Sequence, residues 1–123
     1  MTTVDLTAET FETTLKDSNI MLVDWWAEWC GPCKMFGPTY EKASEQHPDI
    51  VFAKVDTEAN QQLAGSAGIQ SIPTLMAFKE NILIFSQAGA LPPAQLEELI
   101  QAVKVVNMDD VRKEIARQQA EQK

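Results

Sequence analysis

The sequence predicts an α/β fold with a central mixed β-sheet and helices on both of its faces. Short runs dense in β-branched and aromatic residues alternate with segments of helical periodicity, which is typical of α/β domains. One run, residues 20–26, is apolar at nearly every position, as expected of a strand covered on both sides. The length of 123 residues leaves room for one domain of ordinary size.

The first elements are a strand, a helix and a second strand. Residues 2–6 are rich in Thr and Val and predict a short strand. Thr7 is a candidate N-cap for a helix that places Phe11 and Leu15 four positions apart and ends near residues 17–19. The apolar run described above follows at once, so we expect it to form a central strand.

A longer helix and a third strand come next. The helix is predicted from Cys30 to about Gln46, with an apolar face formed by Phe36, Tyr40 and Ala43. Pro38 lies inside this helix and is expected to kink it. Residues 50–55 are again dense in β-branched and aromatic residues and predict another buried strand.

The rest of the domain is predicted as a short helix, a hairpin and a last helix. The short helix covers about residues 58–64, and strands at 72–79 and 82–86 flank a tight turn at Glu80-Asn81. Pro92-Pro93 opens the last helix, which carries an apolar stripe formed by Leu96, Leu99, Ile100 and Val103. The order β-α-β-α-β-α-β-β-α therefore predicts antiparallel strands added to a parallel sheet.

Residues 106–123 extend beyond this predicted domain of residues 1–105. Met108, Val111 and Ile115 form a narrow apolar stripe that predicts a weakly amphipathic extra helix from about 108 to 119. Isolated helices of this length are marginal in water, so we expect the end of the chain to fray or to be partly disordered. The sequence assigns no function to this extension.

The charge pattern excludes several classes of partner. Ten Lys and Arg against eighteen Asp and Glu give a net charge of −8, with no basic cluster that would attract nucleic acid or an anionic membrane. No apolar run reaches the roughly 20 residues that cross a bilayer. The first residues have neither a basic nor an apolar region typical of a secretory signal, so we expect a cytoplasmic protein.

The two cysteines, Cys30 and Cys33, are predicted to be chemical rather than structural, because so short a loop removes little entropy when closed. They fall where a strand turns into a helix, which puts Cys30 at the helix N-terminus. Free backbone N–H groups and the helix dipole lower a thiol pKa there, so Cys30 is the expected nucleophile. Cys33, one turn later, can attack a mixed disulfide on Cys30 and release reduced product.

The sequence resembles the thioredoxin family over nearly its whole length. The matching segments are Leu22-Val23-Asp24-Trp25-Trp26-Ala27-Glu28-Trp29-Cys30-Gly31-Pro32-Cys33-Lys34, Ala53-Lys54-Val55-Asp56, Ser71-Ile72-Pro73-Thr74-Leu75 and Ala88-Gly89-Ala90. The resemblance implies a small electron carrier that reduces protein disulfides in redox homeostasis and holds no cofactor of its own. It also implies that an NADPH-dependent flavoprotein, thioredoxin reductase, returns the electrons.

Asp24 and Lys54 have two interpretations each. Asp24 is either a solvated carboxylate or, as its apolar neighbours favour, a buried one with a raised pKa. The resemblance implies that Asp24 deprotonates Cys33 through a water when the mixed disulfide is resolved. It implies that Lys54 modulates this carboxylate, whereas by residue type alone Lys54 is an ordinary surface lysine.

The resemblance also implies a substrate platform around the cysteines. Its members are Trp29, Gly31, Pro32, Ile72, Pro73, Gly89 and Ala90. Pro73 is expected to follow a cis bond beside the disulfide, and Ile72 to pair its backbone with a bound chain as an added strand. The plainer interpretations are a proline at the start of a strand and a turn glycine at Gly89.

Other residues are expected to be structural, and some depart from the family pattern. His47 is the only histidine and is predicted to be a surface residue at a helix end. Together with the cysteines it does not complete a zinc site, so we expect no metal. Asn81 stands where the family hairpin usually has glycine, and Ser71 where it often has glycine before Ile-Pro.

Two other functions remain open from the sequence. A binding or scaffolding protein with the same fold would not need its cysteines. A second alternative, within redox chemistry, is an oxidase or isomerase, but Gly31-Pro32 between the cysteines resembles reducing members of the family. A monomer is expected.

Overall fold

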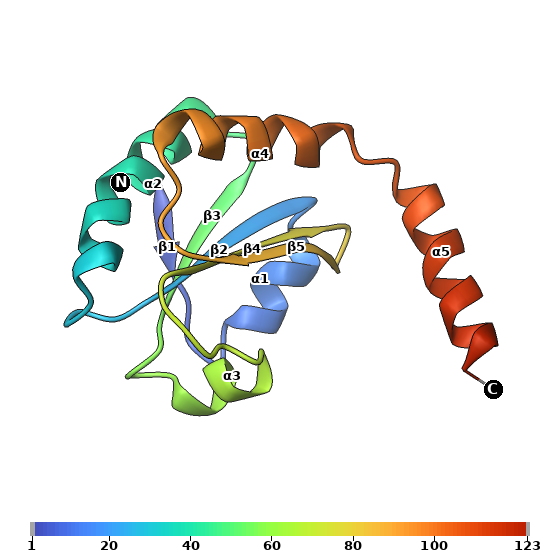
Figure 1. The fold of residues 1–123 in the computed structure, drawn as a ribbon, viewed down its shortest axis with the longest axis horizontal. Helices are drawn as coiled ribbons and strands as arrows, with labels where there is room; N and C mark the ends of the chain where they lie inside the picture. Colours follow the sequence, from blue (N-terminus) through green and yellow to red (C-terminus); the bar gives the residue numbers. More distant parts are fainter. Residues whose placement is uncertain (1, 123) are drawn as a thin grey trace.

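The computed structural model describes residues 2–122 and forms one mixed sheet between two layers of helices (Figure 1). The five strands lie in the order β1-β3-β2-β4-β5. The strands are β1 (Thr3–Asp5), β2 (Ile20–Trp26), β3 (Val51–Asp56), β4 (Thr74–Lys79) and β5 (Ile82–Ala88). The helices are α1 (Phe11–Asp17), α2 (Gly31–Gln46), α3 (Gln61–Ser66), α4 (Pro93–Val105) and α5 (Met108–Glu121).

The predicted α/β architecture is confirmed, with β2 at the centre of the sheet. It pairs in parallel with β3 and antiparallel with β4, while β1 lies parallel to β3 and β5 antiparallel to β4. Six of the seven residues of β2 are buried, because helices cover both faces. The carboxyl end of β2 leads directly into α2, which places that loop at one edge of the sheet.

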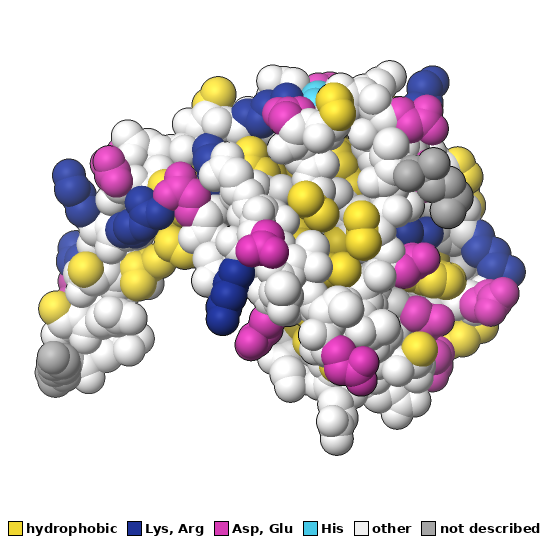
Figure 2. All heavy atoms as spheres, turned by 180° about the vertical axis from the view of Figure 1, so that it is seen from behind, with side chains coloured by type: hydrophobic (Ala, Val, Ile, Leu, Met, Phe, Trp, Pro, Cys, Tyr) yellow, Lys and Arg dark blue, Asp and Glu magenta, His cyan; other side chains and the backbone are white. Residues whose placement is uncertain are grey.

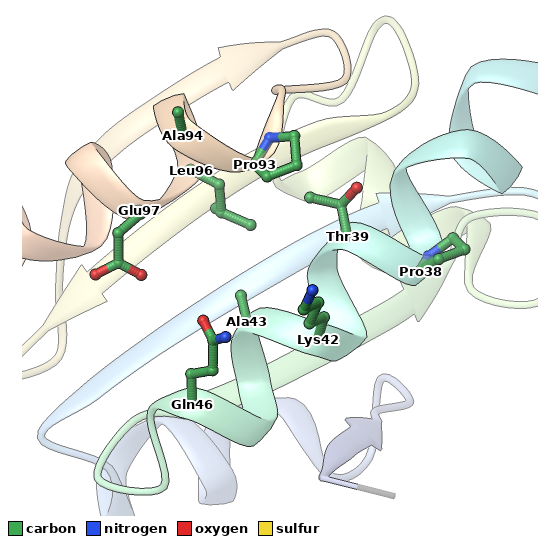
Figure 3. Close-up of a pocket in the computed structure, with 9 residues that line it drawn as sticks. All are labelled: Pro38, Thr39, Lys42, Ala43, Gln46, Pro93, Ala94, Leu96 and Glu97. Atoms are coloured by element: carbon green, nitrogen blue, oxygen red, sulfur yellow. The ribbon is translucent and has the colours of Figure 1, made fainter.

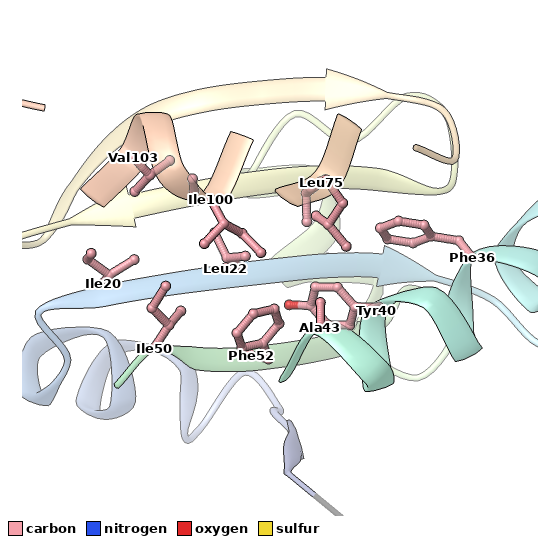
Figure 4. Packing of buried hydrophobic residues seen from close by; sticks show 12 residues of the cluster. Ile20, Leu22, Phe36, Tyr40, Ala43, Ile50, Phe52, Leu75, Ile100 and Val103 are labelled. Atoms are coloured by element: carbon pink, nitrogen blue, oxygen red, sulfur yellow. The ribbon is translucent and has the colours of Figure 1, made fainter. Parts of the chain in front are cut away.

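The two faces of the sheet hold separate apolar cores. Alternate residues of β2 point to opposite faces. Figure 4 shows the core beneath α2 and α4, where Leu22 and Phe52 from the sheet meet Tyr40 and Ile100 from the helices. On the other face, Trp25 packs against Phe11 of α1, with ring centroids 5.8 Å apart. Because Asp24 follows Val23 on β2, it shares the face of Leu22.

Three predicted boundaries were wrong. The first helix begins at Phe11 rather than after Thr7, because the Thr7 carbonyl accepts from the Thr10 and Phe11 amides and closes a turn first. The short helix lies at 61–66 instead of 58–64, because the Asp56 carboxylate accepts from the amides of residues 58 and 59 and holds a turn there. The strand expected at 72–79 starts at Thr74, after the cis bond.

The hairpin turn adopts the conformation that its sequence allows. Glu80 and Asn81 have φ values of 50° and 70°, the left-handed region that two-residue hairpin turns require at both positions. Asn tolerates this region better than most residues, so the hairpin forms without the glycine usual in the family.

The prediction of His47 as a surface residue was wrong. His47 does follow the end of α2, but it is only 7% exposed and stacks on Phe52. Its Nε2–H donates to Glu97 Oε1 at 2.8 Å, and Lys104 Nζ donates to its Nδ1 at 3.1 Å. Both partners lie on α4, so the imidazole links the two helices that cover one face of the sheet.

The predicted C-terminal helix is present as α5, two residues longer than expected. Asn107 caps its start by accepting from the Asp110 amide, and Arg112 forms an ion pair with Glu80 in the hairpin turn. Figure 1 shows that α5 stands away from the sheet. A groove of about 420 Å³ separates it from β5, with Ile82, Leu83, Val111 and Ile115 among its lining residues, and Figure 2 shows hydrophobic side chains there.

Candidate active site

The two cysteines lie at the N-terminus of α2, as predicted. Cys30 is the N-cap residue, and its Sγ accepts from the Cys33 backbone N–H at 3.2 Å. The two sulfurs form a disulfide, with Cα atoms 5.2 Å apart. Gly31 and Pro32 occupy the exposed first turn between them, and Pro32 is at a position where a helix needs no amide donor. A free amide of this turn, that of Cys33, therefore faces Cys30 Sγ.

The segment before β4 lies against this disulfide. The Ile72–Pro73 peptide bond is cis, as the resemblance implied. The carbonyl oxygen of Ile72 is 3.7 Å from Cys30 Sγ, and Pro73 is buried. Ile72 packs on the small buried cluster formed by Ala27 and the two cysteines. The chain thus brings together two segments that are about forty residues apart in the sequence.

Gly89 reaches the same place from the end of β5. Its amide donates to the Pro73 carbonyl at 2.8 Å, and its φ of 106° lies in a region that favours glycine. Ala90 follows as an exposed residue. The predicted platform residues from three loops therefore adjoin: those after β2, before β4 and after β5.

Asp24 is buried, as its apolar neighbours predicted. It is 1% exposed, and neither carboxyl oxygen has a hydrogen-bond partner among residues 2–122. Burial raises its pKa from 3.8 to about 7, against a smaller opposing effect of the Lys54 charge. At neutral pH this carboxyl group is thus close to half ionised, which suits a group that accepts and returns a proton.

Lys54 is the neighbour of Asp24 in the sheet. The two residues are direct partners in the parallel register of β2 and β3, so their side chains leave the same face. Lys54 is half-buried, and its Nζ lies 4.9 Å from the centre of the Trp26 ring. This placement contradicts the interpretation of Lys54 as an ordinary surface lysine and gives Asp24 a cation in its surroundings.

Trp29 is the most exposed aromatic residue near the cysteines, with 70% of its surface open to solvent. Its indole Nε1–H donates to Glu58 Oε1 at 2.7 Å, which ties the β2–α2 loop to the loop before α3. A groove of about 320 Å³ runs beside it, lined also by Thr57, Ile69 and Ile72. An exposed apolar ring beside a groove is typical of a surface that binds a partner chain.

A larger groove lies elsewhere and holds no predicted site residue. It has a volume of about 480 Å³ and runs between α2 and α4, with Pro38, Lys42 and Glu97 among its lining residues (Figure 3). None of the residues that line it belongs to the loops around the disulfide. The predicted chemistry is therefore confined to the open surface at the start of α2.

A family model described as thioredoxin matches residues 2–102. The chain belongs to the thioredoxin family. A putative thioredoxin 2 of Streptomyces coelicolor is 56% identical over 119 residues, which are 97% of this chain and 89% of that protein. A thioredoxin of Bacillus subtilis is 39% identical over 82 residues, 66% of this chain and 79% of that protein.

Solved structures agree with this assignment. A thioredoxin structure from Plasmodium falciparum superposes with a TM-score of 0.76 at 31% identity, covering 80% of this chain and 97% of that chain. A variant thioredoxin from Halobacterium salinarum gives 0.78 at 30% identity, covering 85% and 92%. The chain is thus a thiol-disulfide oxidoreductase of the thioredoxin family, with a redox-active cysteine pair.

Two residues of this thioredoxin site were missed by the sequence reasoning. Tyr40 was treated as a packing residue, yet its hydroxyl donates to the Ala53 carbonyl at 2.8 Å, next to Lys54. Burial raises the pKa of Tyr40 well above its usual value, and the negative charge of Asp24 raises it further. Glu58 gave no local signal, because its partner Trp29 is 29 positions away in the sequence.

Among residues 2–122, no helix is both long and apolar enough to cross a membrane. Members of the thioredoxin family are generally reduced by thioredoxin reductase and act on disulfide substrates.

Proposed function

We propose that this chain reduces disulfide bonds in other proteins, with Cys30 as the attacking and Cys33 as the resolving cysteine. The observation that carries this assignment is the N-cap position of Cys30, whose sulfur accepts a backbone N–H of the first helical turn. A Cys30 thiolate forms there at a lower pH than in a free peptide. Cys33, inside the helix, lacks this position.

The proposed reaction has two exchanges. The Cys30 thiolate attacks one sulfur of the substrate disulfide, which forms a mixed disulfide and releases the other substrate sulfur as a thiolate. Cys33 then loses its proton and attacks Cys30 Sγ, so that the substrate leaves with two thiols and the chain keeps the Cys30–Cys33 disulfide. Two electrons pass from the protein to the substrate.

Asp24 is the proposed base for the second exchange. Its pKa of about 7 lets it take the Cys33 proton, through one water, near neutral pH. The positive charge of Lys54 opposes the effect of burial and keeps part of the carboxyl group ionised. Lys54 is therefore proposed to tune the base rather than to touch the substrate.

The substrate chain is proposed to lie across the three loops at the start of α2. The backbone of Ile72 would pair with it as an added strand, and the exposed ring of Trp29 would cover its apolar part. The residues proposed to contact it are Trp29, Gly31, Pro32, Ile72, Pro73, Gly89 and Ala90. Small or apolar groups at these positions let different substrate sequences approach the disulfide closely.

The physiological setting follows from the family. We propose an NADPH-dependent flavoprotein thioredoxin reductase as the electron donor and disulfide-containing proteins as acceptors. A monomer in the cytoplasm, with no cofactor or metal of its own and no affinity for nucleic acid or membranes, agrees with the charge of −8.

The test is insulin-disulfide reduction by two single variants. We expect Cys30→Ser to lower the rate to background and to form no covalent complex with substrate. Cys33→Ser keeps the attacking thiolate but cannot resolve, so it should trap the mixed disulfide, visible by mass spectrometry. A scaffolding role would instead leave the biological activity intact in a Cys30→Ser, Cys33→Ser double variant.

A further inference from the structure

The loops around the disulfide differ in charge. The segment Ile69–Pro73 and the segment Ser86–Pro93 contain no Asp, Glu, Lys or Arg. The third side, formed by the β2–α2 loop and the loop before α3, carries the exposed acids Glu28 and Glu58. A chain bound across these loops would therefore meet negative charge on one side only.

The position of Glu58 is set by the structure. Its Oε1 accepts from the Trp29 indole at 2.7 Å, which holds the carboxylate at the edge of the exposed ring. The Glu58 amide donates to Asp56 Oδ1, so its backbone is fixed as well. Within residues 2–122, Glu58 Oε2 forms no hydrogen bond and no ion pair. One oxygen thus remains free for a ligand.

Glu28 adds a second acid on the Trp29 side of the site. It precedes Trp29, is exposed, and its carboxylate forms no ion pair within the described part of the chain. At the right edge of Figure 2, where the β2–α2 loop lies, acidic side chains border exposed hydrophobic ones, and Lys or Arg side chains lie next to them. Two lysines belong to the same region: Lys34 is exposed on the first turn of α2, and the half-buried Lys54 holds its Nζ over the Trp26 ring.

We propose that Glu28 and Glu58 make the site prefer disulfides flanked by Lys or Arg. This inference rests on the proposed disulfide reduction and names the substrate class of that same site. A bound chain that pairs with Ile72 passes Trp29, and a basic side chain next to its cysteine would reach the free oxygen of Glu58. An acidic side chain at the same place would be repelled by both carboxylates.

The effect of the net charge on substrate preference must be distinguished from the effect of Glu28 and Glu58. A net charge of −8 attracts any cationic peptide, and both effects weaken as salt shortens the Debye length to about 3 Å at 1 M. Glu45 offers a matched control, because it is exposed on α2 about 22 Å along the helix from Cys30. Glu45→Gln changes the net charge as Glu28→Gln or Glu58→Gln does.

The experiment compares two synthetic peptides, each closed by one internal disulfide and differing in a single Lys or Glu next to one cysteine. We expect the reduced protein to favour the Lys peptide in kcat/KM by about two- to fivefold for each carboxylate at low salt. The ratio should approach one at 1 M salt. Glu28→Gln and Glu58→Gln should each lower it, while Glu45→Gln should not. Gln at 58 can still accept from the Trp29 indole.

The outcomes separate this inference from the proposed function. Equal reduction of both peptides at low salt, or an unchanged ratio in the Glu28→Gln, Glu58→Gln double variant, overturns the charge preference and leaves disulfide reduction standing. If Glu45→Gln lowers the ratio of the two kcat/KM values equally, the preference comes from the net charge, and the proposed role of Glu28 and Glu58 is overturned. Failure to reduce either peptide counts against disulfide reduction itself.

Discussion

Asp24 is the residue whose ionisation the fold changes most clearly. Its folded pKa is about 7, whereas the unfolded value is near 3.8, because burial disfavours the charged carboxylate. Between these values the unfolded chain is ionised and the folded one is not. The stability that the protonated form provides is therefore complete below pH 3.8 and is lost as the pH rises through about 7.

The expected loss is about 4 kcal/mol of unfolding free energy. Asp24→Asn cannot ionise, so it should be more stable than the natural chain by about this amount above pH 7 and nearly equal to it at pH 4. Urea unfolding at both pH values measures the difference. A gap between the two proteins that stays constant with pH would show that Asp24 does not titrate as proposed.

Some site residues are predictable from the sequence because their signal is local. Cys30 and Cys33 share one helical turn, and Asp24 lies within an apolar run that predicts a buried strand. The contact between Trp29 and Glu58 depends on how two loops meet, which no local pattern encodes. Tyr40 lies on the apolar stripe of a helix, so the sequence predicts its packing but not the hydrogen bond of its hydroxyl group.

At the scale of elements, Lys79 connects the end of β4 to the end of α4. Its side chain is buried, and Nζ donates to the carbonyls of Val103, Lys104 and Val106 at 2.9, 2.9 and 3.0 Å. The Val103 carbonyl also accepts from the Val106 amide, whereas the carbonyls of Lys104 and Val106 lie at and beyond the helix end, where helical amide donors run out. All three hydrogens of the ammonium group are thereby used.

Lys79→Met should lower the unfolding free energy by about 2–3 kcal/mol, because it leaves the partly buried carbonyls of Lys104 and Val106 without their Nζ donor. Amide hydrogen exchange should quicken in the last turn of α4. The matched control is Lys16→Met, since Lys16 is exposed in the last turn of α1. Equal effects of the two substitutions on urea unfolding would contradict the capping role of Lys79.

Element types were predictable, but their ends and partners were less so. The continuous apolar run of β2 and the periodic stripe of α4 each identify their element without help from the rest of the chain. The start of α1 was misplaced because the turn closed by Thr7 competes with helix formation. The burial of His47 was missed because it follows from partners fifty or more positions away on α4.

For the whole molecule, the active site and α5 lie at opposite ends of the sheet. Trp25 near the site pairs with Thr74, whereas Ile20 at the other end pairs with Lys79, beside the hairpin turn that Arg112 contacts. Met108 is the one buried residue of α5. The helix is therefore tied to the domain mainly by a buried side chain at its start and by an exposed ion pair.

A chain that ends at Met108 should fold and keep its cysteine chemistry. It loses the Arg112–Glu80 pair, which is exposed to solvent and therefore contributes little to stability. Urea unfolding followed by circular dichroism measures the change. A chain that ends at Val106 also loses the buried methionine and should be less stable by a further 1.5–3 kcal/mol or so. A loss above about 3 kcal/mol in the chain that ends at Met108 would make α5 part of the core.

The alternation of strands and helices was enough to predict a sheet with helices on both faces, because the apolar run of β2 indicates a strand covered on both sides and the helical stripes indicate helices packed on it. The direction in which α5 leaves the domain was not predictable. It depends on Lys79 and Arg112, which act on the chain between α4 and α5 through charged contacts that leave no periodic trace.

The central claim is that the cysteine pair donates electrons, and its reduction potential tests this most directly. Cys30 Sγ accepts the Cys33 backbone N–H and lies 3.7 Å from the Ile72 carbonyl oxygen, and within residues 2–122 no Lys, Arg or His side chain donates to it. We therefore expect the reduced form to be only weakly favoured, as in a reductant.

We would equilibrate the protein with mixtures of reduced and oxidised glutathione and follow Trp29 fluorescence. The account predicts a potential clearly below that of the glutathione couple, so that the disulfide persists until reduced glutathione is in large excess. A potential well above that couple would identify an oxidant or isomerase and contradict the proposed direction of electron flow.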